Sequence, residues 1–246
     1  MSARGGRIVE AVAVATLAGA LGLLTGWVLD SIFDTSFIAY VAAAIALVNG
    51  AISGWRGIYA WRAPQGYVGF ALDSTWSLVM TTAGVFANVW GIAEKDSDYL
   101  PNLSERKNVH VYRRGLMPRS GFAITLGNVI GGADDVERES RQLLIEEHEV
   151  VHVWQARWLG PIFPILYGSW SLFGALYGVV MWAARHREQQ FGKVVETYSY
   201  YCNPVEWWAY SRAGKWRPSK MEDGCGWRKS MVRPHAQVAQ RSRATE

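Results

Sequence analysis

Long stretches without a charged side chain dominate the pattern of hydrophobic and polar positions along this chain. Four such windows cover residues 11–29, 35–55, 74–93 and 158–184. Each is near or above the roughly 18–20 apolar residues that a helix needs to cross a bilayer. The pattern therefore predicts an α-helical integral membrane protein that contacts lipid through several helices.

The first two windows predict a transmembrane hairpin over residues 1–62, because only the short acidic segment 30–34 separates them. Each helix of this hairpin carries a glycine pair at GxxxG spacing, namely Gly22/Gly26 and Gly50/Gly54. This spacing lets two helices approach closely in lipid, although a glycine-rich composition alone would also produce it.

Basic residues flank the two apolar windows of the hairpin, with Arg4 and Arg7 before the first and Arg56 and Arg62 after the second. Because positive charge accumulates on the cytoplasmic side of membrane helices, we expect both ends there. A cleaved signal peptide is not expected, since the first apolar run continues well past its Ala-x-Ala-like string. These features predict a multi-pass protein of a bacterial-type plasma membrane, with its site on the cytoplasmic side.

The window 74–93 is open to two interpretations. Its larger apolar residues recur at helical spacing, while polar residues occupy the other faces of the same helix. Either a membrane span or an amphipathic helix that lies on the membrane or against the domain fits this pattern.

Half of the residues are hydrophobic and 19% are charged, against about 25% charged in a typical soluble domain. This composition argues against a disordered chain. Residues 214–246 are the exception, and we expect them to form a basic, disordered tail at the membrane surface. Nucleic acid is not an expected partner, because no nucleic-acid-binding signature accompanies the basic charge. Cys202 and Cys225 are too few for a disulfide framework.

Residues 95–135 have a different character, with polar loops around two β-rich runs at 109–112 and 122–130. These runs predict strands of a small sheet outside the membrane. From Asp134 the pattern becomes helical with an acidic first turn, and we expect Gly160-Pro161 to end this helix.

The most informative motif is His148-Glu149-Val150-Val151-His152, an HExxH sequence inside the predicted helix. Residues four apart lie one above the other on a helix, so His148 and His152 can bind the same Zn²⁺ ion. Glu149 then reaches the water on the metal as a general base. The alternative is a helix with two ordinary solvated or hydrogen-bonded histidines.

A catalytic zinc site of this kind needs a third protein ligand. The longer HExxHxxGxxH motif is excluded, because Gln155 and Trp158 stand where it needs glycine and histidine. Glu206 is the best candidate and Glu196 is the reserve, because no motif surrounds the remaining histidines, His110, His186 and His235.

With Glu206 as a ligand, the chain resembles the gluzincin metallopeptidases, and within them the membrane-embedded CAAX prenyl endopeptidase and HtpX type. The resemblance covers the HExxH motif from His148 to His152 and an ExxA motif from Glu206 to Ala209, with Tyr210 in place of the aspartate that follows in the family. It implies a zinc ion on His148, His152 and Glu206. Tyr210 could instead hydrogen-bond a bound carbonyl as an oxyanion stabiliser.

The sequence around Glu206 also fits an ordinary helix start. Asn203 would be the N-cap, Pro204 the first helical residue and Glu206 the third, in a pattern like a capping box. Capping and zinc ligation are both open for Glu206 at this point.

The window 158–184 lies between His152 and Glu206, and a single membrane crossing there would separate two ligands of one ion. Three arrangements avoid this. The window is a re-entrant hairpin broken near residues 167–169, or the chain crosses and returns through residues 190–206, or the window is a buried core helix.

We expect a small α+β zincin-like metalloprotease domain over residues 63–213 that hydrolyses peptide bonds. A strand next to the active helix binds extended peptide in zincins, and residues 122–130 are the candidate, although a plain core strand fits equally well. The expected partners are the bilayer, a peptide or membrane-protein substrate, and subunits of a membrane complex. The alternatives are a non-catalytic scaffold with a degenerate zincin-like domain, and a zinc hydrolase that acts on a lipid or small amide. The intact Glu149 favours an enzyme.

Overall fold

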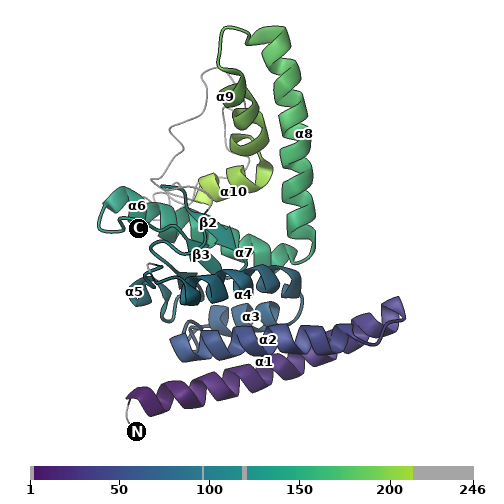
Figure 1. Cartoon of the computed structure of the whole chain (residues 1–246), viewed down its shortest axis with the longest axis vertical. Helices are drawn as coiled ribbons and strands as arrows, with labels where there is room; N and C mark the ends of the chain where they lie inside the picture. The colour runs from purple at the N-terminus through teal and green to yellow at the C-terminus, as the bar shows by residue number, and fades with distance from the viewer. Residues whose placement is uncertain (1–2, 96, 118–120, 213–246) are drawn as a thin grey trace, which may run out of the picture.

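The computed structural model of the chain describes residues 3–95, 97–117 and 121–212. Helices make up most of this part of the chain, and one small three-stranded sheet lies among them (Figure 1). This architecture confirms the coarse form of the predicted fold, a mainly helical chain with a small sheet. The predicted tail at 214–246 lies outside the described residues.

Helices α1 (Ala3–Phe33) and α2 (Ile38–Arg56) form the predicted hairpin. Their backbones approach so closely that a Cβ atom on Gly26 would lie 2.5 Å from Cα of Ala39, and one on Gly54 would lie 2.7 Å from Cα of Ala11. Large apolar side chains such as Trp27 point outwards. Small residues inside and large apolar residues outside are typical of helices that pack in lipid.

The acidic corner between the two helices caps the second one. The carboxylate of Asp30 accepts hydrogen bonds from the backbone amides of Ile38 and Ala39 and from the hydroxyl of Thr35. These bonds satisfy amides that have no partner within the helix, and they fix the start of α2 at the tip of the hairpin.

The window 74–93 is not one continuous helix. Helix α3 (Pro64–Ser74) and helix α4 (Leu78–Ala93) meet at a bend of 94°. Helix α4 buries small and polar residues and turns Val79, Phe86 and Ile92 outwards. Apart from the buried Met80, its large apolar side chains therefore face the surroundings of the molecule.

The sheet consists of β1 (His110–Val111), β2 (Ile124–Leu126) and β3 (Val129–Gly131), in the order β1-β3-β2. Strand β1 is parallel to β3, and β2 is antiparallel to it. The short helix α5 (Pro101–Ser104) precedes β1. The prediction of a single strand over 122–130 is wrong, because the chain reverses at Gly127, whose φ of +58° is a left-handed conformation that glycine adopts without strain. Strand β2 is thus an edge strand.

The HExxH motif lies in a continuous helical stretch of α6 (Glu139–Leu143), a π-helical turn η1 (Leu144–Glu149) and α7 (Val150–Leu159). The predicted start at Asp134 is wrong, since Asp134 has a φ of +58° and the helix begins at Glu139. The predicted end is confirmed, because Gly160 follows the last helical residue with a φ of +51°.

Helix α8 (Ile162–Arg185) fills the fourth window without a break near residues 167–169, so the re-entrant arrangement is wrong. Of its residues, all of which are described, the buried ones are Gly174 and Gly178, so it is not a buried core helix either. The chain instead returns along α8 through the segments α9 (Phe191–Glu196), η2 (Thr197–Tyr201) and α10 (Pro204–Arg212).

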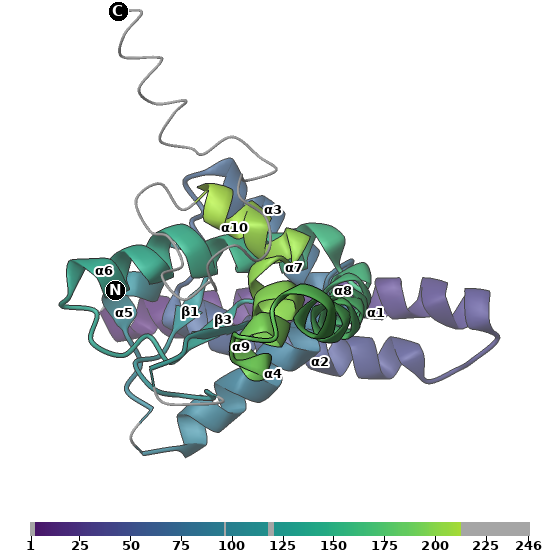
Figure 2. The same cartoon turned by 90° about the horizontal axis from the view of Figure 1, so that it is seen from above.

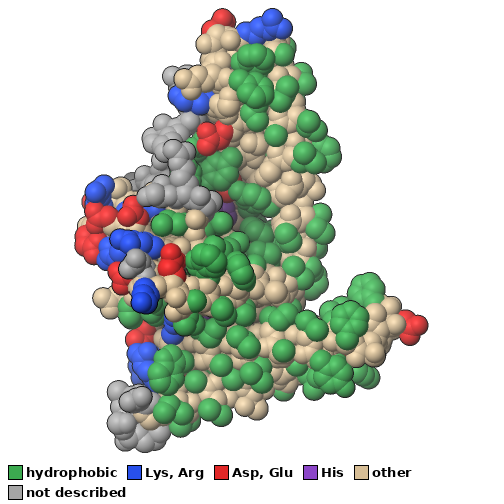
Figure 3. All heavy atoms as spheres, viewed as in Figure 1, with side chains coloured by type: hydrophobic (Ala, Val, Ile, Leu, Met, Phe, Trp, Pro, Cys, Tyr) green, Lys and Arg blue, Asp and Glu red, His purple; other side chains and the backbone are tan. Residues whose placement is uncertain are grey.

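Within the described residues, α1, α2 and α8 are long and apolar enough to cross a membrane, and the bent pair α3 and α4 would be a fourth if it forms one broken span. Helix α8 runs crosswise to the hairpin, as Figure 1 shows from the side and Figure 2 along the axis of α8. Hydrophobic side chains cover the outer face of α8 and the hairpin, whereas charged side chains gather around α5 and α6 (Figure 3). The surface is compatible with a membrane protein.

Candidate metal centre

The HExxH motif straddles the junction of the π-helical turn and α7. His148 and Glu149 are the last two residues of η1, and His152 lies in the first turn of α7. Within a longer helix, a single π-helical turn is uncommon and often marks a functional site. His148 and His152 are both buried, and their rings meet edge to face with centroids 4.8 Å apart.

Glu206 completes a compact group of three buried side chains that could hold a metal ion. Its Oε2 atom lies 3.4 Å from Nε2 of His148 and 3.3 Å from Nε2 of His152. The two Nε2 atoms are themselves 3.2 Å apart. The three donor atoms therefore form a nearly equilateral triangle.

The size of this triangle fits zinc. Ligand atoms at bonds of about 2.0–2.1 Å stand about 3.3–3.4 Å apart when they occupy corners of a tetrahedron. Two imidazole nitrogens and one carboxylate oxygen are a donor set of catalytic zinc sites, which keep the fourth corner open. The three sequence-predicted ligands thus meet with the spacing that a tetrahedral ion requires.

The start of α10 places Glu206. The side chain of Asn203 accepts a hydrogen bond from the amide of Val205 at 3.0 Å, which confirms Asn203 as the N-cap. The amide of Asn203 donates to the carbonyl of Tyr200. Asn203 therefore caps α10 while the side chain of Glu206 faces the two imidazoles. Glu196, the reserve candidate, is not part of the three-residue cluster.

The carboxylate of Glu206 and the imidazole of His152 each favour the charged form of the other. Burial opposes the ionised form of Glu206, but the two facing imidazoles outweigh it and hold the pKa of this carboxyl far below its usual range. Burial also disfavours the charged form of His152, yet the carboxylates of Glu206 and Glu149 and the hydrogen bond to Gln155 raise its pKa to about 9. A carboxylate therefore faces two imidazoles at this site.

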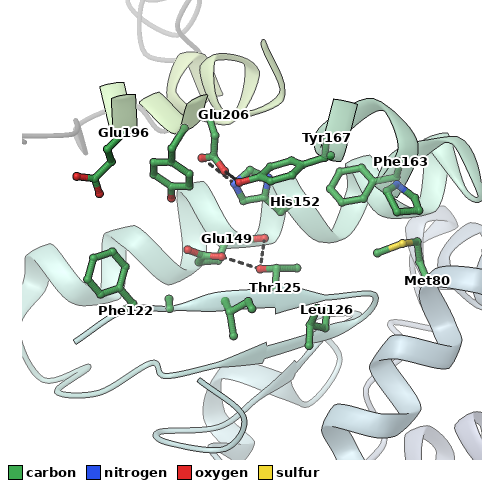
Figure 4. A pocket seen from close by; sticks show the side chains of 15 residues that line it. Met80, Phe122, Thr125, Leu126, Glu149, His152, Phe163, Tyr167, Glu196 and Glu206 are labelled. Carbon is green, nitrogen blue, oxygen red and sulfur yellow. Dashed lines mark hydrogen bonds and ion pairs between the residues drawn. The ribbon is translucent and has the colours of Figure 1, made fainter. Parts of the chain in front are cut away.

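Glu149 lies between the metal cluster and the sheet. Its Oε2 atom accepts a hydrogen bond of 2.6 Å from the hydroxyl of Thr125 on β2. Figure 4 shows its carboxylate between Thr125 on one side and His152 and Glu206 on the other.

A cavity of about 590 Å³ opens over this group. Glu149, His152 and Glu206 line it together with the strand segment 122–126, and most of the other lining side chains are apolar or aromatic. Phe163 and Tyr167 enter it from α8, and Met80 enters from α4 (Figure 4). Strand β2, at the edge of the sheet, thus forms one wall of the cavity, next to the predicted general base.

Two tyrosines that the sequence did not single out are close to the centre. The hydroxyl of Tyr167 donates a hydrogen bond of 2.8 Å to Oε1 of Glu206, and Tyr200 also lines the cavity. Tyr210 stacks on the ring of His148, with centroids 4.7 Å apart, and is not among the residues that line the cavity. The oxyanion role of Tyr210 stays a prediction, and in the structure its ring packs against the ring of His148.

The remaining histidines lie elsewhere. His110 is buried in β1, where its Nε2 atom lies 3.0 Å from the hydroxyl of Ser53. His186 follows the last residue of α8, and His235 lies outside the described residues.

Scans of the chain against protein-family models, curated proteins and solved structures each found no match. The geometry of the site is therefore the guide to its function.

Proposed function

We propose that this protein is a membrane-bound zinc metallopeptidase with His148, His152 and Glu206 as ligands and Glu149 as general base. The observation that carries the proposal is the triangle of donor atoms, with sides of 3.2, 3.3 and 3.4 Å. Glu149 next to the first ligand distinguishes this arrangement from a purely structural metal site.

Zinc bound there would act as a Lewis acid that polarises a carbonyl and lowers the pKa of water to about 7. Glu149 accepts the proton of the water that attacks the amide, and the hydrogen bond from Thr125 holds its carboxylate in place. Tyr167 fixes Glu206 through Oε1, which leaves Oε2 facing the two imidazoles.

The position of β2 at the edge of the sheet supports a peptide substrate. An extended chain that pairs with Ile124–Leu126 would lie along the wall of the cavity and pass next to Glu149. A peptide in this position receives its backbone hydrogen bonds from the strand, and the apolar lining receives its side chains. The apolar helices α1, α2 and α8 support a membrane location. The arginines that flank the two apolar windows of the hairpin support a site on the cytoplasmic side.

The test compares the purified wild-type chain in detergent with Glu149→Gln and with Glu146→Gln. Glu146 is a matched control, because it lies in the same π-helical turn but is exposed and pairs with Lys107. Zinc content is measured by elemental analysis, and cleavage is measured by mass spectrometry on a peptide library. We expect zinc in all three proteins, and cleavage about 10²–10⁴-fold slower in Glu149→Gln alone.

Zinc without any difference in cleavage between wild type and Glu149→Gln would overturn the peptidase and favour the non-catalytic scaffold. If the wild type cleaves a lipid amide or a small amide but no peptide, and Glu149→Gln has lost this cleavage, the result would favour the zinc hydrolase of that class. A wild-type chain that holds no zinc would overturn both enzymes.

A further inference from the structure

Gln155 lies one helical turn after His152 and is buried beneath the metal cluster. Its side chain makes two hydrogen bonds. The Oε1 atom lies 2.7 Å from Nδ1 of His152, and the Nε2 atom donates to the backbone carbonyl of Val205 at 2.9 Å. A buried amide with both ends bonded has one fixed orientation.

The partners decide which atom of the amide faces which group. A backbone carbonyl only accepts hydrogen bonds, so the Gln155 atom that faces Val205 must be the NH₂ group. The atom that faces His152 is then the carbonyl oxygen, which also only accepts. Nδ1 of His152 must therefore carry a hydrogen, and in the neutral ring the lone pair is on Nε2. That lone pair points at the metal cluster.

We propose that Gln155 is a positioning residue for the metal centre, an inference that rests on the proposed zinc site. It holds His152 in the tautomer that can bind a metal through Nε2, and it sets the orientation of the ring. Partners of this kind raise metal affinity because they remove the wrong tautomer and limit rotation of the ligand.

Gln155 also joins two ligands that are far apart in sequence. Val205, which receives its amide bond, is the residue immediately before Glu206. One side chain thus connects the helix of the two histidines to the first turn of α10, which carries the carboxylate ligand. The bond to His152 orients one corner of the triangle of donor atoms, and the bond to Val205 joins α10 to α7.

A connection between α7 and α10 alone would make Gln155 a structural residue, and two variants separate the two roles. Gln155→Met keeps the length of the side chain but offers no acceptor to His152. Gln155→Glu keeps an acceptor for Nδ1–H but lacks the NH₂ group that Val205 needs. Asn49→Leu is the control, because Asn49 is an equally buried amide in α2 that is bonded to Tyr59 and Asn128 and is not among the metal ligands.

The experiment measures the zinc affinity of the full chain in detergent by competition with a chromogenic chelator, and thermal unfolding of the same samples. We expect Gln155→Met to weaken zinc binding about 10–100-fold. We expect Gln155→Glu to bind zinc close to the wild-type affinity although its unfolding temperature falls. Asn49→Leu should lower the unfolding temperature without a change in zinc affinity.

Equal losses of zinc affinity in Gln155→Met and Gln155→Glu, or wild-type affinity in Gln155→Met, would overturn the positioning role. A wild-type chain without zinc affinity would instead overturn the metal site itself. If Gln155→Met does not fold, the absorption spectrum of bound Co²⁺ decides. A carboxylate partner makes an imidazole ligand more basic, so Gln155→Glu should shift this spectrum, and an unchanged spectrum contradicts the inference.

Discussion

Helix α7 contributes to two buried polar clusters that differ in how hydrogen-bond donors and acceptors are arranged. Arg157 forms an ion pair in which its Nε and Nη2 atoms each donate to one oxygen of Asp73 at 2.8 Å. His152, five residues earlier, belongs to the metal cluster. In the first cluster donors face acceptors, whereas in the second three potential acceptor atoms converge within 3.4 Å. Convergence of acceptors, more than burial, identifies the candidate site.

The ion-pair cluster has a structural task. Asp73 also accepts hydrogen bonds from Tyr59 and from Asn128, which in turn bonds to Asn49 of α2. This network joins the hairpin, α3, the sheet and α7 in one buried unit. It holds the helix of the metal ligands against the hairpin, while the metal cluster opens to a cavity.

Breaking the ion pair should have the largest effect on stability. Arg157→Met leaves the carboxylate of Asp73 buried without its counter-charge, which costs about 3–5 kcal/mol of unfolding free energy. The double variant Asp73→Leu with Arg157→Met should lose less, because no lone charge remains. Denaturant unfolding in detergent measures both. Equal stability of Arg157→Met and wild type would contradict a structural role for this cluster.

The close contact of the hairpin should have the next largest effect. Gly54→Ala adds a methyl group 2.7 Å from Cα of Ala11, and overpacking of this kind costs about 1–3 kcal/mol. Gly6→Ala is the control, since a Cβ atom there would meet nothing within 4 Å. Thermal unfolding should separate the two variants. The same unfolding temperature for both would show that the helices do not pack through their glycines as described.

A smaller effect, confined to the metal cluster, is expected for Tyr167→Phe. The variant loses the hydrogen bond to Oε1 of Glu206, which is worth about 1–1.5 kcal/mol or roughly tenfold in zinc affinity. Tyr177→Phe removes a hydroxyl from the exposed side of the same helix and should bind zinc like the wild type. Chelator competition measures both, and identical affinities would exclude Tyr167 as a support of Glu206.

The sequence predicted the parts of the site that depend on local geometry. The four-residue spacing of His148 and His152 places both rings on one face in any helix. The ExxA motif predicts Glu206 as the third ligand, and the structure brings it to both imidazoles. The sequence also predicts the hairpin, since its two long apolar windows are separated by a short polar corner.

Contacts between segments that are distant in sequence could not be predicted from the sequence. Tyr167 reaches Glu206 across 39 positions, and Gln155 reaches Val205 across 50, so no local pattern marks either bond. The acidic residues after Asp134 resembled the first turn of a helix, but Glu137 pairs with Arg113 at 2.8 Å. Only the reversal at Gly127 had an available signal, because Gly-Asn between two β-rich runs is typical of a hairpin turn.

The zinc affinity of three purified proteins tests the central claim most directly. Glu206→Gln removes the charge of the third ligand, whereas Glu196→Gln removes an equal charge from the wall of the same cavity. We expect one zinc ion per chain in wild type and Glu196→Gln at the same affinity, and a loss of about 10²-fold or more in Glu206→Gln. Equal zinc binding by Glu206→Gln and wild type, or no zinc in the wild type, would contradict a metal centre on His148, His152 and Glu206.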